Sequence, residues 1–221
     1  MQSWFLIDGR LPDIPYPGDV SVRYPEPLVE QMLTEYSRPN DWILDPFCGF
    51  GTTLTVCSRM NRNAVGIEKN ASVYAFARRL LPTSTRYHHD RAENIASYGY
   101  PKFQLILTSP PFRSFRDDAE AGFASYYDDL VAIFAAMLPA LAPGARVVVE
   151  TVNLPPDSDS TGMRAFRSAL ALSTILTFVR EHICCHRDGS DVVTGCQHSY
   201  LLVFRRADAP ELCESTDHVE S

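Results

Sequence analysis

Apolar runs of strand length alternate with helical patterns along most of this 221-residue chain. Alternation of this kind is typical of an α/β fold, in which each helix carries the chain back so that the next strand lies parallel to the last. The sequence therefore predicts a mostly parallel sheet. Its expected strands are Trp42–Phe47, Ala64–Glu68, Tyr87–Asp90, Phe103–Thr108, Arg146–Glu150, Val179–His186 and Ser199–Phe204.

Helical patterns fill the spaces between these runs. The longest, Ser125–Leu141, is expected to end at Pro143-Gly144, which turns the chain into the fifth strand. A short polar turn, without a helical pattern, joins the last two runs, so we expect them to pair as one antiparallel strand in the sheet. The other expected helices are the stretch from Leu28 to Tyr36, Thr52–Met60, Ala71–Leu81 and Met163–Leu176.

Composition indicates an ordinary globular protein, with 45% hydrophobic and 21% charged residues. We expect one domain over residues 1–206, followed by an acidic, disordered tail over residues 207–221. The tail holds five carboxylates and no Lys or Arg, so most of the net charge of −7 lies there and the body is close to neutral. Since neither an export signal nor a run of roughly 20 apolar residues is found, a cytoplasmic location is expected.

The cysteine pattern does not indicate a disulfide framework or a metal centre. Six cysteines in a chain of this length are expected to be buried thiols. The cluster Cys184-Cys185-His186 with Cys196 and His198 matches no standard zinc spacing, and adjacent residues on a strand point to opposite faces. No metal is therefore expected.

A glycine-rich segment, Asp45-Pro-Phe-Cys-Gly-Phe-Gly-Thr-Thr53, follows the first apolar strand and opens a helix. Gly49 and Gly51 let the backbone approach a ligand closely, and the helix N-terminus offers free N–H groups. Thr52 or Thr53 is expected to cap the helix. Because phosphate-binding loops avoid a carboxylate, Asp45 favours a cationic or amino-bearing ligand over a pyrophosphate.

Two further carboxylates are expected at the same edge of the sheet. Glu68 ends the second strand, about 20 residues after the glycine turn, where a nucleoside cofactor presents its ribose hydroxyls. Asp90 ends the third strand and is positioned to accept a hydrogen bond from an adenine amino group. Each also has a simpler interpretation as a solvated acid at a strand end.

The fourth strand leads into Thr108-Ser109-Pro110-Pro111-Phe112. Both prolines lack an N–H and have a fixed φ, so the carbonyls of Ser109 and Pro110 are presented rigidly at the carboxyl edge of the sheet. Such acceptors suit a substrate –NH₂ group, and Phe112 is expected to stack on its ring.

These two segments resemble the DNA amino-methyltransferases that modify cytosine N4 or adenine N6. Asp45–Thr53 is similar to the cofactor motif of that family, and Thr108–Phe112 to its catalytic motif. The stretch Pro25–Tyr36 resembles the helix before the cofactor motif, and His198–Phe204 resembles the closing strand. The resemblance extends from about Ser21 to Arg206 and implies a Rossmann-like, seven-stranded class I methyltransferase sheet.

The resemblance also implies S-adenosylmethionine as cofactor. An arylamine nitrogen is a poor nucleophile, but holding both of its hydrogens off the ring plane favours a tetrahedral nitrogen that can attack a methyl sulfonium in line. The implied catalytic residues are Ser109, Pro110, Pro111 and Phe112. The implied cofactor-binding residues are Asp45, Phe47, Gly49, Gly51, Thr52, Thr53, Glu68, Asp90 and Thr108.

A serine at Ser109 is similar to the cytosine-N4 enzymes, so N4 methylation of cytosine in DNA is the favoured activity, with adenine N6 second. Arg113 and Arg116 flank Phe115 and are candidate phosphate contacts beside an extruded base, or else part of a solvated loop. Family members usually carry a target-recognition region, whereas only residues 113–124 separate the catalytic motif from the next helix here. RNA, a small amino-heterocycle, or a partner protein that supplies recognition are therefore alternatives.

Overall fold

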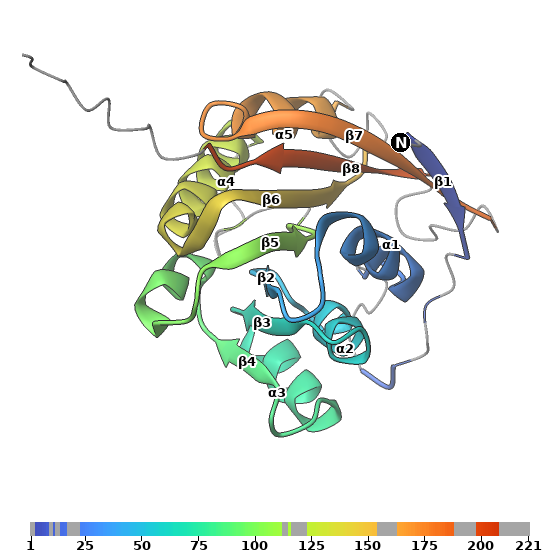
Figure 1. Cartoon of the computed structure of the whole chain (residues 1–221), viewed down its shortest axis with the longest axis vertical. Coiled ribbons are helices and arrows are strands. Elements are labelled where there is room, and N and C mark those ends of the chain that lie inside the picture. Colours follow the sequence, from blue (N-terminus) through green and yellow to red (C-terminus); the bar gives the residue numbers. More distant parts are fainter. Residues whose placement is uncertain are drawn as a thin grey trace, which may run out of the picture.

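The computed structural model describes residues 3–8, 11, 14–16, 23–111, 115, 123–153, 163–187 and 198–207. Eight strands in these ranges form one sheet in the order β1-β7-β8-β6-β5-β2-β3-β4 (Figure 1). β8 runs antiparallel to both of its neighbours, and the other adjacent strands pair in parallel. The strands are β1 Trp4–Ile7, β2 Trp42–Asp45, β3 Asn63–Glu68, β4 Arg86–His89, β5 Phe103–Thr108, β6 Leu141–Thr151, β7 Thr177–His186 and β8 His198–Arg205.

Helices cover both faces of the sheet (Figure 1). One face is covered by α1 (Glu26–Tyr36) and α2 (Thr52–Arg59), with α3 (Ala71–Leu80) beside α2. The opposite face is covered by α4 (Phe123–Met137), α5 (Arg164–Leu172) and the 3₁₀ helix η1 (Ala92–Tyr98). The expected mostly parallel α/β sheet with one antiparallel strand is therefore confirmed.

The number of strands differs from the seven that were expected. The additional strand, β1, pairs in parallel with the outer side of β7 and forms one edge of the sheet. It is only four residues long, and Trp4 and Leu6 remain about half exposed. The run Trp-Phe-Leu-Ile has high strand propensity, but it shows no alternation of apolar and polar residues. The sequence pattern therefore did not predict this short edge strand.

The long helix was expected to end at Pro143-Gly144, but it does not. The helix ends earlier, in the 3₁₀ turn η2 (Leu138–Ala140), and the two residues lie inside β6. There the pairing between β5 and β6 shifts register, with Phe103 opposite Leu141 but Leu105 opposite Arg146. A proline cannot donate to the ladder, so it is accommodated where the ladder is already interrupted.

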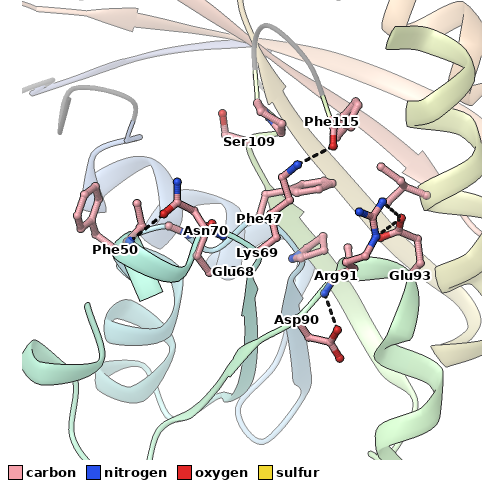
Figure 2. Close-up of a pocket in the computed structure, with 16 residues that line it drawn as sticks. Phe47, Phe50, Glu68, Lys69, Asn70, Asp90, Arg91, Glu93, Ser109 and Phe115 are labelled. Atoms are coloured by element: carbon pink, nitrogen blue, oxygen red, sulfur yellow. Dashed lines mark hydrogen bonds and ion pairs between the residues drawn. The ribbon is translucent and has the colours of Figure 1, made fainter. Parts of the chain in front are cut away.

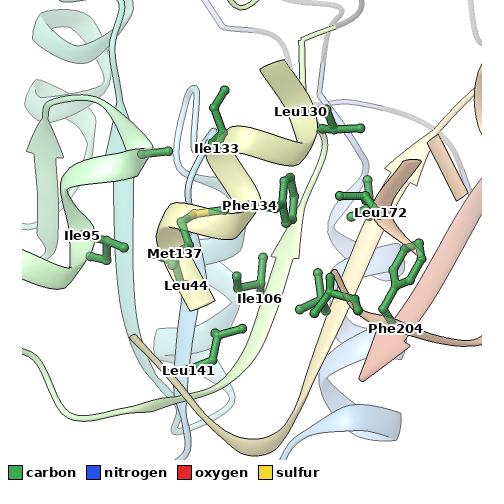
Figure 3. Packing of buried hydrophobic residues seen from close by; sticks show 14 of the residues in the cluster. Leu44, Ile95, Ile106, Leu130, Ile133, Phe134, Met137, Leu141, Leu172 and Phe204 are labelled. Atoms are coloured by element: carbon green, nitrogen blue, oxygen red, sulfur yellow. The ribbon is translucent and has the colours of Figure 1, made fainter. Parts of the chain in front are cut away.

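The larger core lies between the sheet and α4 (Figure 3). Phe134 and Met137 of α4 are fully buried against strand residues such as Ile106. The neighbouring strand residues Leu105 and Leu107 face the other side, beneath α1 and α2. Since successive side chains of β5 enter different cores, the strand is fixed on both faces and its carboxyl end is held in a rigid position.

The carboxyl ends of the parallel strands β2 to β6 lie along one edge of the sheet, which ligands of open α/β sheets commonly use. Polar residues lie at or next to the ends of several of these strands: Asp45, Glu68, Asp90, Thr108 and Glu150. In the part of the chain that the structure describes, no helix is long and apolar enough to cross a membrane.

Replacing Phe134 with Ala should lower the free energy of unfolding by about 3–5 kcal/mol, because it leaves a cavity in the larger core. Urea denaturation followed by circular dichroism measures the change. Leu170→Ala is the matched control: that side chain is 73% exposed on α5, and its loss should cost less than about 0.5 kcal/mol. Equal losses for the two variants would contradict the packing described.

Candidate functional site

The glycine turn between β2 and α2 has the backbone shape that the sequence predicted. Gly49 and Gly51 both have positive φ, +50° and +86°, a region that favours glycine. A Cβ added at Gly49 would meet nothing within 4 Å, so this glycine borders open space. The expected threonine cap is wrong, however: Gly51 is the N-cap of α2, without a side-chain cap. The N-terminus of α2 therefore keeps backbone N–H groups for a ligand.

Asp45 lies at the centre of a buried hydrogen-bond network rather than on the open surface. Its Oδ2 accepts from the hydroxyls of Tyr24 at 2.9 Å and Thr53 at 2.5 Å. Its Oδ1 accepts from the Thr108 hydroxyl at 2.7 Å and the Phe47 N–H at 3.3 Å. Burial raises the pKa of Asp45, although these donors oppose the shift. The network joins the segment before α1, the glycine turn and the end of β5.

Glu68 supports the glycine turn from the neighbouring strand. Its Oε2 accepts from the Gly49 N–H at 3.0 Å, and its Oε1 from the Asn70 N–H at 2.7 Å. Burial raises the pKa of Glu68, and these two backbone donors partly offset it. Each carboxylate oxygen retains a second lone pair, so Glu68 has capacity to accept from a ligand that lies on the turn.

Asp90 is engaged mainly by the helix that follows it. Its Oδ1 accepts from the Arg91 N–H at 2.7 Å and from Asn94 at 2.8 Å, while its Oδ2 accepts from the Tyr98 hydroxyl at 2.8 Å. Burial alone would raise the pKa of Asp90, but these donors outweigh it and the pKa is lowered. Asp90 lines the cavity described next, with its carboxylate bonded to residues of η1.

A cavity of about 370 Å³ lies beside the glycine turn, Glu68 and Asp90 (Figure 2). Its lining includes Gly49, Glu68, Asp90 and Ser109, which come from four different places in the sequence. Such a volume is within the range of small-molecule sites, roughly 300–1,000 Å³. The structure thus brings the glycine turn and the segment Ser109–Pro111 to one cavity.

An aromatic wall closes one side of this cavity. The Phe47 ring lies 5.4 Å from that of Phe115, which stacks on Tyr126 at 4.9 Å. Lys69 reaches across and donates to the Phe115 carbonyl at 2.6 Å (Figure 2). Phe115 is 4% exposed, so its ring packs inward and is not part of a surface that could contact a phosphate. Arg113 and Arg116 themselves lie outside the described residues.

The catalytic motif is described up to Pro111. Pro110 is buried, and Ser109 and Pro111 line the cavity. The Ser109 hydroxyl donates to Glu150 Oε2 at 2.7 Å. Phe112, the expected stacking residue, lies outside the described residues, so that role stays a prediction.

Three residues of this site carried no prediction from the sequence. Tyr24 and Lys69 gave no signal, because their partners are distant in sequence. Glu150 could have been found from the sequence, because, like Glu68, it is an acid near the end of an apolar strand at the carboxyl edge.

Among the described residues, no group of His, Cys, Asp or Glu is arranged to hold a metal ion.

Replacing Asp45 with Ala should lower the free energy of unfolding by about 3–5 kcal/mol, since buried hydroxyls of Tyr24, Thr53 and Thr108 lose their acceptor. Chemical denaturation measures the loss. Glu30→Ala provides the control, because it removes only an exposed ion pair with Arg59 and should cost less than about 1 kcal/mol. A loss no larger for Asp45→Ala than for the control would contradict the network.

Asp90→Asn should destabilise the protein in a pH-dependent way. Because the folded-state pKa of Asp90 is below its ordinary value of 3.8, the carboxylate stabilises the fold above that value, and the contribution is lost as pH falls through the folded pKa. Denaturation midpoints should therefore separate wild type from variant at pH 7 and converge in strong acid. A separation that is independent of pH would refute the assignment.

Residues 18–79, which include the glycine turn and Glu68, match the family model described as DNA methylase, for N6 and N4 methyltransferases. Among curated relatives, the type II methyltransferase M.SmaI of Serratia marcescens is 39% identical over 64 residues, 29% of this chain and 22% of that protein. M.HinfI of Haemophilus influenzae is 39% identical over 61 residues, 28% of this chain and 17% of its own length. The match thus spans about a fifth of each relative.

Solved structures show the same fold over most of the chain. The N-methyltransferase NodS of Bradyrhizobium japonicum, in complex with S-adenosyl-L-homocysteine, has a TM-score of 0.57 at 13% identity, covering 82% of this chain and 85% of that one. A SAM-dependent methyltransferase of Methanosarcina mazei has a TM-score of 0.59 at 12% identity, covering 80% and 98%. The chain therefore has the class I methyltransferase fold, and its residues 18–79 are similar to the DNA methylase family.

Proposed function

We propose that this protein is an S-adenosylmethionine-dependent methyltransferase that modifies an exocyclic amino group of a nucleobase in DNA. The observation that carries the proposal is the common cavity. The segment that matches the DNA methylase family lines it on one side, and the Ser109 motif lines it on the other. One motif would hold the methyl donor and the other the amine.

The residues of the cavity fit this cofactor. Gly49 leaves open space where any other residue would place a Cβ, and Glu68 retains acceptor capacity for a ribose diol. The charged residues on the lining are three carboxylates, Glu68, Asp90 and Glu93, and two basic residues, Lys69 and Arg91. This small excess of negative charge suits a cationic ligand. Bound S-adenosylmethionine would supply an electrophilic methyl group attached to a sulfonium.

Asp45 would act behind the site rather than within it. Both of its oxygens already accept hydrogen bonds from Tyr24, Thr53, Thr108 and the Phe47 N–H. Its role would be to hold the glycine turn at a fixed distance from the end of β5. Phe47 would contribute an apolar face to the cavity, in contact with Phe115.

The remaining residues would bind and orient the amine. Ser109 and the rigid carbonyls of Ser109 and Pro110 would accept both hydrogens of a substrate –NH₂, which directs the nitrogen lone pair toward the donor side of the cavity. The aromatic wall would exclude water from the reacting atoms. Phe112 would stack on the base, and Arg113 and Arg116 would contact its phosphates.

Cytosine N4 is the substrate atom we favour, on the basis of Ser109, and adenine N6 is the alternative. The near-neutral body and the short segment after the catalytic motif favour a second possibility. In it, the same chemistry acts on RNA or a small amino-heterocycle, or requires a partner that supplies target recognition.

Incubation of the purified protein with methyl-labelled S-adenosylmethionine and equal amounts of DNA, RNA or free nucleosides tests the proposal. Label should enter DNA, and nucleoside mass spectrometry should identify N4-methylcytosine. Ser109→Ala should reduce the rate by about 10²-fold, as expected when a preorganised polar group at the reacting centre is lost. Label that enters only RNA or nucleosides would refute DNA as substrate, and an unaffected Ser109→Ala rate would refute the assigned site.

A further inference from the structure

We propose that Glu150 sets the hydrogen-bond polarity of Ser109, so that the site selects a base carrying an amino group over its oxo counterpart. Glu150 is thus a positioning residue that acts through Ser109. The inference rests on the proposed function, since it assigns the chemical basis on which that site would recognise its substrate.

The pairing of β5 with β6 places the two side chains together. Thr108 of β5 is opposite Val149 of β6, so Ser109 follows at the level of Glu150. Their contact, 2.7 Å from Ser109 Oγ to Glu150 Oε2, is within the range of a strong O–H···O bond. Because Glu150 lies on the ladder itself, paired with Leu201 of β8, the sheet fixes the backbone from which its side chain extends.

The surroundings of Glu150 favour a fixed orientation. The residue is 8% exposed, in a strand whose neighbouring positions are buried. The pKa of the nearby Cys184 thiol is raised, first by burial and then by the negative charge of Glu150. That thiol therefore stays protonated and adds no competing negative charge.

The direction of the bond determines what Ser109 offers to the cavity. An ionised carboxylate only accepts hydrogen bonds, so the single hydroxyl hydrogen of Ser109 is engaged by Glu150. Ser109 is one of the residues that line the cavity, so we infer that its hydroxyl oxygen is left to present lone pairs to a ligand there. This oxygen can accept a hydrogen bond from the –NH₂ group of cytosine or adenine. In uracil or hypoxanthine a carbonyl replaces that group, so two acceptor oxygens would meet with no hydrogen between them. A buried mismatch of this kind is strongly rejected.

Binding of matched oligonucleotides tests the inference. With S-adenosylhomocysteine present, fluorescence anisotropy would compare oligo(dC) with oligo(dU) and oligo(dA) with oligo(dI). Wild type should bind the amino member of at least one pair about tenfold more tightly. In Glu150→Gln, the amide can donate to Ser109, which frees the hydroxyl to donate in turn, so the preference should fall to the part that the backbone carbonyls of Ser109 and Pro110 provide.

A double-mutant cycle separates action through Ser109 from a general effect. Ser109→Ala should also lower the preference, leaving only the part that the backbone carbonyls of Ser109 and Pro110 provide, and adding Glu150→Gln to it should change nothing further. Glu181→Gln is the matched control on the same sheet, exposed on β7, and should keep the wild-type preference. Thermal melting and calorimetric titration with S-adenosylhomocysteine should be unchanged in Glu150→Gln.

The outcomes distinguish this inference from the proposed function. If wild type binds neither S-adenosylhomocysteine nor any oligonucleotide, the proposed function fails, and the inference with it. If wild type binds both but shows no amino preference, or Glu150→Gln retains the full preference, only the inference is overturned. It is equally overturned if Glu150→Gln lowers the melting temperature and the cofactor affinity together, because Glu150 would then act as a general structural residue.

Discussion

The carboxylate of Asp45 is the interaction on which the rest of the site depends. It accepts from Tyr24, Thr53 and Thr108, which belong to segments that are distant in sequence. A buried carboxylate is costly unless it is fully hydrogen-bonded, and these donors are themselves costly to bury without an acceptor. The arrangement is therefore stable only when all segments are present, which makes the network a strict determinant of where the glycine turn meets β5.

This role changes how the conspicuous acids of the chain are understood. Asp45 and Glu68 both have a raised pKa because they are buried, whereas hydrogen bonds to η1 lower the pKa of Asp90. Asp45 organises the backbone around the glycine turn. Glu68 accepts from that turn and retains lone pairs for a ligand, whereas Asp90 accepts from the start of a 3₁₀ helix. Acids at equivalent strand ends therefore have different roles. Their hydrogen-bond partners, rather than their positions along the sheet, determine these roles.

Periodicity predicted the elements that bury continuous apolar surface. β5 was predicted with its observed bounds, because a central strand covered on both faces is mostly apolar, as Phe103 and Leu105–Leu107 show. β1 was missed because an edge strand buries little, and Pro143-Gly144 was interpreted as a stop because its place inside β6 depends on a register shift with β5. The glycine turn was predicted because its local sequence is sufficient for its shape. Thr53 was assigned the wrong partner, and Tyr24 and Lys69 were missed, because their bonds depend on tertiary contacts.

We propose that the cavity between the glycine turn and Ser109 binds S-adenosylmethionine. Isothermal titration of the purified, folded chain with S-adenosylhomocysteine tests it most directly, with Glu68→Gln as the companion variant. We expect one binding site per chain. The affinity should fall at least about tenfold in Glu68→Gln, because a charge-assisted hydrogen bond is lost. No binding to the wild-type chain, or equal affinity in the two proteins, would contradict it.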